Sequence, residues 1–188
     1  MRIIAGKFRG RKLKSPPSLQ TRPTSDRLRE TLFNILAPRI AGARFLDLCA
    51  GTGAVGIEAV SRGAAQLTFV DQSRKMRALI EANLETFNIE EREIEIVTSE
   101  ASDFLRKLVK KAKEPFDIIF FDPPYAADYE TVLDYIGEHA RELLVKAGVL
   151  IVEHDQKKEL REKSGELKRY RVVKQGDSSL SFYERSVA

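Results

Sequence analysis

A glycine-rich turn between an expected strand and an expected helix constrains the fold of this chain more than any other feature. Residues 45–49 are apolar enough for a buried strand, and Ala50-Gly51-Thr52-Gly53-Ala54-Val55-Gly56 follows with the spacing G-x-G-x-x-G. A helix over 57–61 and a second apolar strand over 67–71 come next. A strand, a crossover helix and a strand predict a βαβ unit in a parallel sheet.

The same alternation continues through the chain. It predicts further strands over 94–97, 116–121 and 148–152, a helix that Ser73 caps and that runs to about Phe87, and helices over 102–112 and 132–144. The last two expected strands, 166–173 and 179–184, are separated by a short turn at Gly176-Asp177, which predicts an antiparallel hairpin. The expected fold is therefore α/β and Rossmann-like, with a mostly parallel sheet and an antiparallel strand at one edge.

Residues 1–40 form a separate prediction, an extension in front of a domain over 41–188. Two short strands around a glycine turn are expected in 1–14, as a β-hairpin, followed by a helix that Ser25 or Thr24 caps and Pro38 ends. Residues 1–25 carry seven Lys and Arg and no acid, which makes them +7 while the rest of the chain is −3.

This charge distribution predicts contact with a polyanion, although a charge run alone is more often a solvated tail. Apolar residues interleave with the basic ones, as expected for a short hairpin. The residues predicted to contact the phosphates of such a polyanion are Arg2, Lys7, Arg9, Arg11, Lys12, Arg22 and Arg27.

Composition excludes several classes of protein. The 188 residues are 43% hydrophobic and 32% charged, as in a soluble globular domain. No apolar run reaches the roughly 18 residues that span a bilayer, and residues 1–7 lack the long apolar core of a signal peptide. One cysteine and two scattered histidines favour neither a disulfide nor a metal site. These features predict a cytoplasmic protein that binds no membrane and no metal.

The glycine turn indicates a nucleoside-containing cofactor. Asp71 ends the next strand, 18 residues after Gly53, where it can hydrogen-bond ribose hydroxyls. NAD and S-adenosylmethionine (SAM) sites share this architecture. Asp47, just before the glycines, suits an ammonium and a sulfonium better than a pyrophosphate, although it could also serve only the turn. The predicted cofactor is SAM, bound by Asp47, Ala50, Gly51, Gly53, Asp71, Gln72, Glu100, Ala101 and Asp122.

Glu100 and Ala101 are expected beside the adenine, because they follow the third strand. For Glu100, acceptance of a hydrogen bond from the adenine amino group and a role as a first-turn acid on the helix dipole are equally good interpretations.

The strand over 116–121 ends abruptly in Asp122-Pro123-Pro124-Tyr125, since proline cannot continue a sheet ladder. These four residues are the predicted catalytic site. An exocyclic amine is a poor nucleophile because its lone pair is delocalised into the ring. Asp122 and the Pro123 carbonyl could accept its N–H groups and aim that lone pair, while Tyr125 stacks on the base. A base in a duplex would have to be flipped out. The alternative is an ordinary β-turn with an exposed tyrosine.

Four segments, over 1–13, 22–34, 46–53 and 122–125, together resemble the bacterial 16S ribosomal RNA guanine-N2 methyltransferase family, which uses SAM to methylate the guanine at position 966. The resemblance implies a seven-stranded class I methyltransferase fold, with Asp71 on the ribose, Glu100 near the adenine, and Asp122 and Tyr125 at the target base. It also implies a substrate in the assembled or assembling 30S subunit, with neighbouring ribosomal proteins as further contacts. Glu100 departs from the family, where Asp or Asn is common.

Other functions share parts of this pattern. DNA adenine-N6 and cytosine-N4 methyltransferases also use Asp-Pro-Pro-Tyr, but no region here resembles a separate target-recognition domain. Protein glutamine methyltransferases carry Asn-Pro-Pro-Tyr instead. The glycines alone would also fit an NAD-dependent oxidoreductase, and the basic extension alone would fit a non-catalytic RNA-binding protein.

Overall fold

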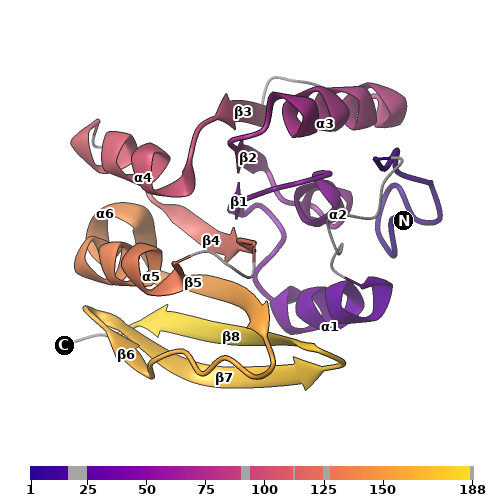
Figure 1. The fold of residues 1–188 in the computed structure, drawn as a ribbon. Coiled ribbons are helices and arrows are strands. Elements are labelled where there is room, and N and C mark those ends of the chain that lie inside the picture. The colour runs from indigo at the N-terminus through magenta and orange to yellow at the C-terminus, as the bar shows by residue number, and fades with distance from the viewer. Residues whose placement is uncertain (17–24, 90–93, 112, 125–127, 187–188) are drawn as a thin grey trace. The chain divides into compact units, whose positions relative to one another are not determined.

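The computed structural model describes residues 1–16, 25–89, 94–111, 113–124 and 128–186. These residues form two compact units, Met1–Thr98 and Ser99–Ala188, which Figure 1 shows in indigo to magenta and in rose to yellow. Each unit is an α/β arrangement with its own strands and is described here by itself. The predicted division between residues 40 and 41 stays a prediction, and residues 1–16 pack within the first unit.

The first unit contains a three-stranded parallel sheet in the order β3-β2-β1. Phe45 pairs with Leu67, and Leu67 pairs with Ile94, so the buried apolar positions of the strands lie side by side. Helices α2 and α3 contact the sheet, and Figure 1 shows both on the same side of it. The elements are α1 (Asp26–Leu36), β1 (Arg44–Leu48), α2 (Ala54–Ser61), β2 (Gln66–Asp71), α3 (Arg74–Phe87) and β3 (Ile94–Thr98).

Local capping fixes where two of these helices begin. The Ser25 hydroxyl accepts a hydrogen bond from the Leu28 N–H at 3.1 Å, and the Ser73 hydroxyl accepts one from the Met76 N–H at 3.4 Å. Both serines satisfy a main-chain donor that the first turn of a helix leaves unpaired. The two predicted caps are thus confirmed.

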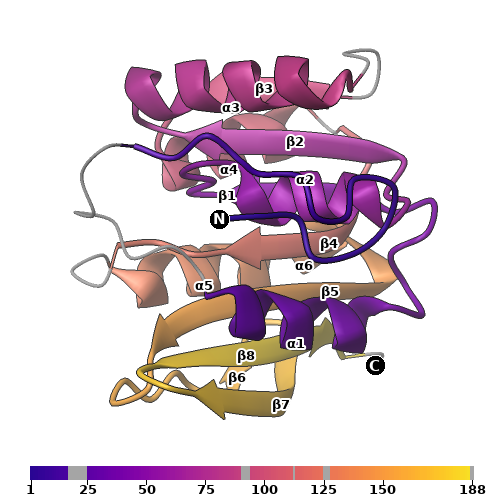
Figure 2. The same ribbon diagram turned by 90° about the vertical axis from the view of Figure 1, so that its right-hand side faces the viewer.

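The predicted β-hairpin in residues 1–14 is formed only in part. The described segment has turns and one isolated antiparallel bridge between Arg2 and Lys12, with no strands. The two arms are paired by main-chain hydrogen bonds, from the Ile3 N–H to the Arg11 carbonyl at 3.0 Å and from the Leu13 N–H to the Met1 carbonyl at 3.1 Å. The pairing does not extend into regular strands, because the Ile4 and Ala5 N–H groups bind the Glu58 carboxylate of α2 at 2.7 and 3.0 Å. In Figure 2 this N-terminal segment, residues 1–16, runs across α2 between α1 and α3.

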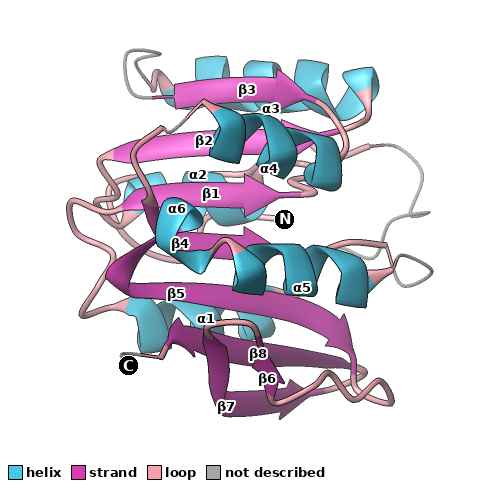
Figure 3. Ribbon diagram, turned by 90° about the vertical axis from the view of Figure 1, so that its left-hand side faces the viewer, coloured by secondary structure: helices cyan, strands magenta, loops and turns pink. Residues whose placement is uncertain are grey.

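The second unit orders its strands β4-β5-β8-β7-β6. Strands β4 and β5 are parallel, and the pairs β5–β8, β7–β8 and β6–β7 are antiparallel. Figure 3 shows α5 and α6 on one face of β4 and β5. The elements are α4 (Ala101–Lys110), β4 (Phe116–Phe121), α5 (Tyr129–Glu138), α6 (Ala140–Leu143), β5 (Leu144–Asp155), β6 (Lys163–Ser164), β7 (Leu167–Gln175) and β8 (Ser178–Arg185).

The predicted C-terminal hairpin is confirmed, but three details of the second unit differ from the sequence prediction. The single helix expected over 132–144 is two helices, which meet at His139 with φ −111°. The described residues contain eight strands in place of the implied seven, because the two-residue strand β6 follows β5. The antiparallel part is therefore three strands, with β8 between β5 and β7 rather than at an edge.

Candidate functional site

The first candidate site is the turn that joins β1 to α2. Gly51 and Gly53 both have positive φ, at 53° and 75°, and Gly53 caps α2. Cys49 also has a positive φ, at 64°, which a residue with a side chain adopts only when its surroundings hold it there. Its N–H donates to the Val70 carbonyl at 2.8 Å. The glycine turn is therefore a strained backbone loop clamped against the end of β2.

Two carboxylates hold the glycine turn by accepting hydrogen bonds from its main-chain N–H groups. Asp47 accepts the Gly56 N–H at 2.9 Å, and Asp71 accepts the Gly51 N–H at 2.9 Å and the Ser73 N–H at 2.8 Å. Each carboxylate oxygen can accept a second hydrogen bond. The predicted cofactor residues thus lie at the ends of β1 and β2 and in the turn between β1 and α2: Asp47, Ala50, Gly51, Gly53, Asp71 and Gln72, of which Gln72 is exposed.

Asp47 is buried, with 1% of its surface exposed. Burial raises its pKa to about 7, the charge of Asp71 acts in the same direction, and the hydrogen bond from Gly56 lowers it. A carboxyl group with this pKa changes charge near neutral pH, which is a property of functional sites. The structure shows that Asp47 serves the turn, and a second role toward a ligand remains a prediction.

The residues around this turn fit SAM. A Cβ built on Gly51 would meet no atom within 4 Å, so open space lies outside the loop, whereas one built on Gly56 would lie 2.3 Å from a ring carbon of Phe69. Gly56 therefore serves packing, and Gly51 leaves room for a ligand. The local donor and acceptor set is a buried acid, an acid at a strand end and a helix N-terminus, which suits a ligand that carries cations and a ribose.

The second candidate site is the end of β4. Asp122 is half-buried, Pro123 is buried and Pro124 is exposed, and Tyr125 lies outside the described residues. The Pro123 carbonyl accepts a hydrogen bond from the Tyr129 hydroxyl at 3.3 Å, and the Tyr129 ring meets the Phe121 ring edge-on at a centroid distance of 6.2 Å. The predicted acceptor at Pro123 is therefore held in a fixed direction.

Sequence reasoning missed Tyr129, which is 1% exposed and is also covered by the Lys158 ammonium, 3.9 Å from its ring centroid. A second tyrosine four residues after Tyr125 was the available signal. The first residue of α5 thus supports the predicted catalytic turn from behind.

Glu100 and Ala101 lie at the start of α4, in the second unit. Glu100 is the N-cap residue of that helix, but its side chain makes no capping hydrogen bond and is exposed. The carboxylate therefore does not serve the helix as a cap, and its predicted contact with adenine stays a prediction.

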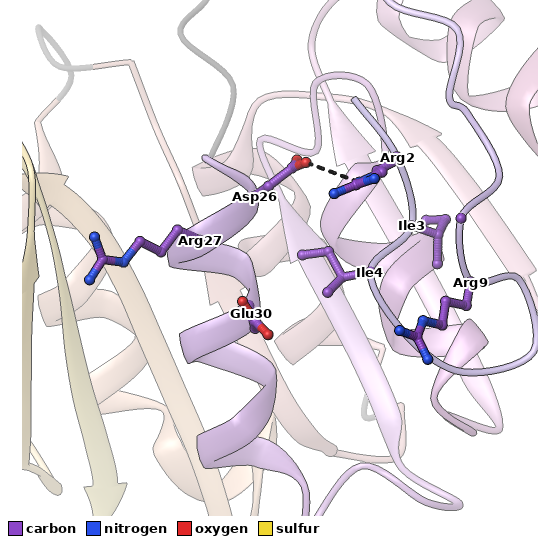
Figure 4. Close-up of a pocket in the computed structure, with 8 residues that line it drawn as sticks. Arg2, Ile3, Ile4, Arg9, Asp26, Arg27 and Glu30 are labelled. Atoms are coloured by element: carbon purple, nitrogen blue, oxygen red, sulfur yellow. Dashed lines mark ion pairs between the residues drawn. The ribbon is translucent and has the colours of Figure 1, made fainter.

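Most of the predicted RNA-contacting residues are exposed on the N-terminal segment and α1. Arg2, Arg9 and Arg27 line one pocket with the acids Asp26 and Glu30 around Ile3, Ile4 and Gly10, as Figure 4 shows. The pocket has a volume of about 440 Å³, and Arg2 pairs with Asp26 across it at 3.8 Å. Lys7 and Lys12 are also exposed, and Arg22 lies outside the described residues.

Arg11 differs from the other basic residues. Its guanidinium donates to the carbonyls of Thr86 and Phe87 at the C-terminal end of α3 and lies 4.6 Å from the Phe87 ring centroid. A cation at a helix C-terminus stabilises the helix dipole. The structure therefore gives Arg11 a structural role in holding the N-terminal segment, beside its predicted contact with RNA.

The buried groups that dock the N-terminal segment have no local sequence signal. Glu58 is fully buried and accepts the Arg62 Nε at 2.7 Å as well as two main-chain N–H groups. Arg29 is fully buried and donates to the Arg2 carbonyl at 2.6 Å. Desolvation lowers the pKa of Arg29, which the neighbouring Asp26 and Glu58 partly oppose. Their partners in the N-terminal segment lie 27 to 54 residues away in the sequence.

In the described part of the chain, no group of three or more His, Cys, Asp or Glu could hold a metal ion. None of its helices combines the length and the apolar character needed to cross a membrane.

The family Conserved hypothetical protein 95 matches residues 1–184. The chain belongs to this family. It is 35% identical to the Bacillus subtilis protein named "Putative rRNA methyltransferase YlbH", over 98% of this chain and 99% of that one. The solved Escherichia coli structure named "Putative methyltransferase yhhF" has a TM-score of 0.84 at 35% identity, over 99% of this chain and 98% of that one.

A third relative is the Escherichia coli protein named "Ribosomal RNA small subunit methyltransferase D". It is 45% identical over 66% of this chain, and the match spans 60% of that protein. These matches place the chain among the class I, SAM-dependent methyltransferases, with their Rossmann-like α/β fold. The predicted family and the predicted cofactor are confirmed.

Proposed function

We propose that this protein transfers a methyl group from SAM to the exocyclic N2 of a guanine in 16S ribosomal RNA, at the position equivalent to 966, within an assembled or assembling 30S subunit. The observation that carries the reaction is the end of β4, where Asp122 follows a buried strand and the Pro123 carbonyl is fixed by Tyr129. Similarity to the Escherichia coli small subunit methyltransferase supports the substrate.

The chemistry follows from the difficulty of methylating an amine conjugated to a ring. When bound, SAM supplies an electrophilic methyl group on a sulfonium. Asp122 and the Pro123 carbonyl accept the two N–H groups of the amine, which turns its lone pair toward that methyl group. The proton that the nitrogen loses on methylation would pass to Asp122 or to water. Tyr125 is proposed to stack on the base.

The cofactor half of the proposal uses the glycine turn. Asp71 would accept the ribose hydroxyls, and Asp47 would face the ammonium and sulfonium charges through the turn. Glu100 and Ala101 would border the adenine. RNA would be held by the exposed cations of the N-terminal segment and α1, since phosphate contacts dominate affinity for nucleic acids. Contacts with neighbouring ribosomal proteins are part of the same proposal.

Radiolabelled SAM tests this function directly. The label should enter 30S particles or 16S RNA that lack the mark, and mass spectrometry should map it to one guanine as N2-methylguanine. Duplex DNA should take up no label, and the protein should bind S-adenosylhomocysteine in preference to NADH. A protein that binds S-adenosylhomocysteine but labels no small-subunit substrate would refute the proposal.

The RNA-binding surface gives a separate prediction. Replacing Arg9 and Lys12 together by alanine should weaken binding to 16S RNA and reduce the slope of log affinity against log salt concentration by roughly one for each lost phosphate contact. Filter binding between low and physiological salt measures that slope.

Lys146→Ala removes an exposed cation from the start of β5 and is the matched control, which should leave the slope unchanged. Removing residues 1–20 would be a poorer test, because it also strips the buried side chains of Ile3, Phe8 and Leu13 from the core. Equal slopes for the double variant and the control would contradict the assignment.

A further inference from the structure

One polar residue lies on the apolar face of α3. Asn83 is fully buried beside Ile80, Leu84 and Phe87, which are the helix positions that face the core. A buried amide without partners destabilises a fold, so such groups are almost always hydrogen-bonded. The partners of Asn83 therefore show why a polar residue occupies this position.

Asn83 makes three hydrogen bonds, all to main-chain atoms. Its Oδ1 accepts the Lys14 N–H at 2.8 Å, and its Nδ2 donates to the Lys14 carbonyl at 3.2 Å and to the Thr52 carbonyl at 3.1 Å. The orientation of the amide follows from this set, because a flipped amide would face donor to donor and acceptor to acceptor at all three contacts.

The two partners of Asn83 belong to different parts of the candidate site. Lys14 lies near the end of the described N-terminal segment, and Thr52 lies between the two glycines of the cofactor turn. Helix α3 also contacts the glycine turn about one helical turn before Asn83, since a Cβ built on Gly53 would lie 3.1 Å from Ile80 Cγ1. A single side chain thus joins the segment proposed to meet RNA to the loop that meets the cofactor.

We propose that Asn83 is a positioning residue that couples the docking of the N-terminal segment to the conformation of the cofactor turn. When Lys14 is docked, two of the three hydrogen bonds hold the amide plane, and the third holds the Thr52 carbonyl. When Lys14 leaves, the amide loses those two partners and no longer fixes the direction of that carbonyl. By linkage, a cofactor that orders the turn must also strengthen docking of the segment.

The coupling between the N-terminal segment and the cofactor turn requires only that the turn binds the cofactor. A role of this coupling in RNA binding rests on the proposed function. The test is therefore built without RNA, so that failure of the proposed substrate and failure of the coupling give different results.

Asn83→Ala is compared with Ser61→Ala, a matched variant. Ser61 also anchors the N-terminal segment, because its hydroxyl accepts the Phe8 N–H at 2.9 Å and donates to the Ala5 carbonyl at 2.6 Å. No hydrogen bond among the described residues joins it to the glycine turn. Calorimetry should show affinity for S-adenosylhomocysteine about fivefold weaker in Asn83→Ala and within about twofold of wild type in Ser61→Ala.

Hydrogen–deuterium exchange gives the readout that a merely structural role would not change. S-adenosylhomocysteine should slow exchange of the amides of residues 3–13 in the wild type and in Ser61→Ala, but not in Asn83→Ala. Asn83→Asp, which keeps the side-chain volume and the acceptor for Lys14 but not the donor for Thr52, should behave like Asn83→Ala and serves if the alanine variant unfolds. Equal affinities in the two alanine variants, or ligand protection of the segment without Asn83, would overturn the proposal.

Discussion

Replacement of Asp122 by alanine should lower the rate of methyl transfer by about a thousandfold and leave affinity for S-adenosylhomocysteine within about threefold of the wild-type value. The carboxylate follows the buried strand β4 and is half-buried, next to a carbonyl that Tyr129 fixes. Its removal takes away an acceptor that the amine needs for orientation, and single-turnover labelling measures the loss.

Asp128→Asn provides the control for this variant. Asp128 is an exposed acid six residues further on, and its side chain caps α5 by accepting the N–H groups of Glu130 and Thr131. Asparagine caps helices equally well, so the substitution removes a nearby negative charge without unfolding the helix. A similar loss of rate in both variants would show that the local charge matters and that Asp122 has no specific role.

Replacement of Asp47 by asparagine should stabilise the free protein at pH 8 and weaken its affinity for SAM. Burial raises the pKa of Asp47 to about 7 from an ordinary value of 3.8. The folded state therefore binds a proton more tightly than the unfolded chain, and the free energy of unfolding falls as pH rises from about 4 to 7. An amide carries no charge, so the variant should gain about 2–4 kcal/mol at pH 8 and little at pH 4.

Ligand binding should show the opposite preference. A cationic ligand favours the ionised carboxylate, so wild-type affinity for SAM should increase with pH up to about 7 and then level off. The Asp47→Asn variant should lose this dependence and bind at least about tenfold more weakly at pH 8. Denaturant titration and calorimetry at both pH values measure the two effects. Asp103→Asn, at an exposed acid on α4, is the control. If Asp47→Asn bound SAM with wild-type affinity, the role of Asp47 would be only structural, through its hydrogen bond with the Gly56 N–H.

The sequence was sufficient wherever the determining contacts are local. Ser25 and Ser73 act on N–H groups three residues away, and the prolines after Asp122 end β4 by their own geometry. The glycine turn was predictable for the same reason. β6 was missed because a two-residue strand has no periodicity to detect.

The rest could not be predicted because the partner is remote in the chain. Glu58 satisfies N–H groups more than 50 residues away, which leaves the expected hairpin with a single bridge in place of two regular strands. Asn83 meets Lys14 at a separation of 69 residues, and its only sequence signal is a polar residue at an apolar helix position. Tyr129 is closer to the predicted turn, but its contact with Pro123 depends on how α5 leaves that turn.

The way in which the N-terminal segment docks on α2 and α3 also allows much of its sequence to be replaced. Glu58, Ser61 and Asn83 recognise its main chain and not its side chains. Where Ile3, Phe8 and Leu13 are kept for the core and Arg11 is kept for its contacts with the end of α3, the other basic positions between them can change without loss of attachment. A segment with a different charge pattern could be grafted at this place. Under the proposed function, such a graft would change the RNA-contacting surface and leave the residues proposed for methyl transfer untouched.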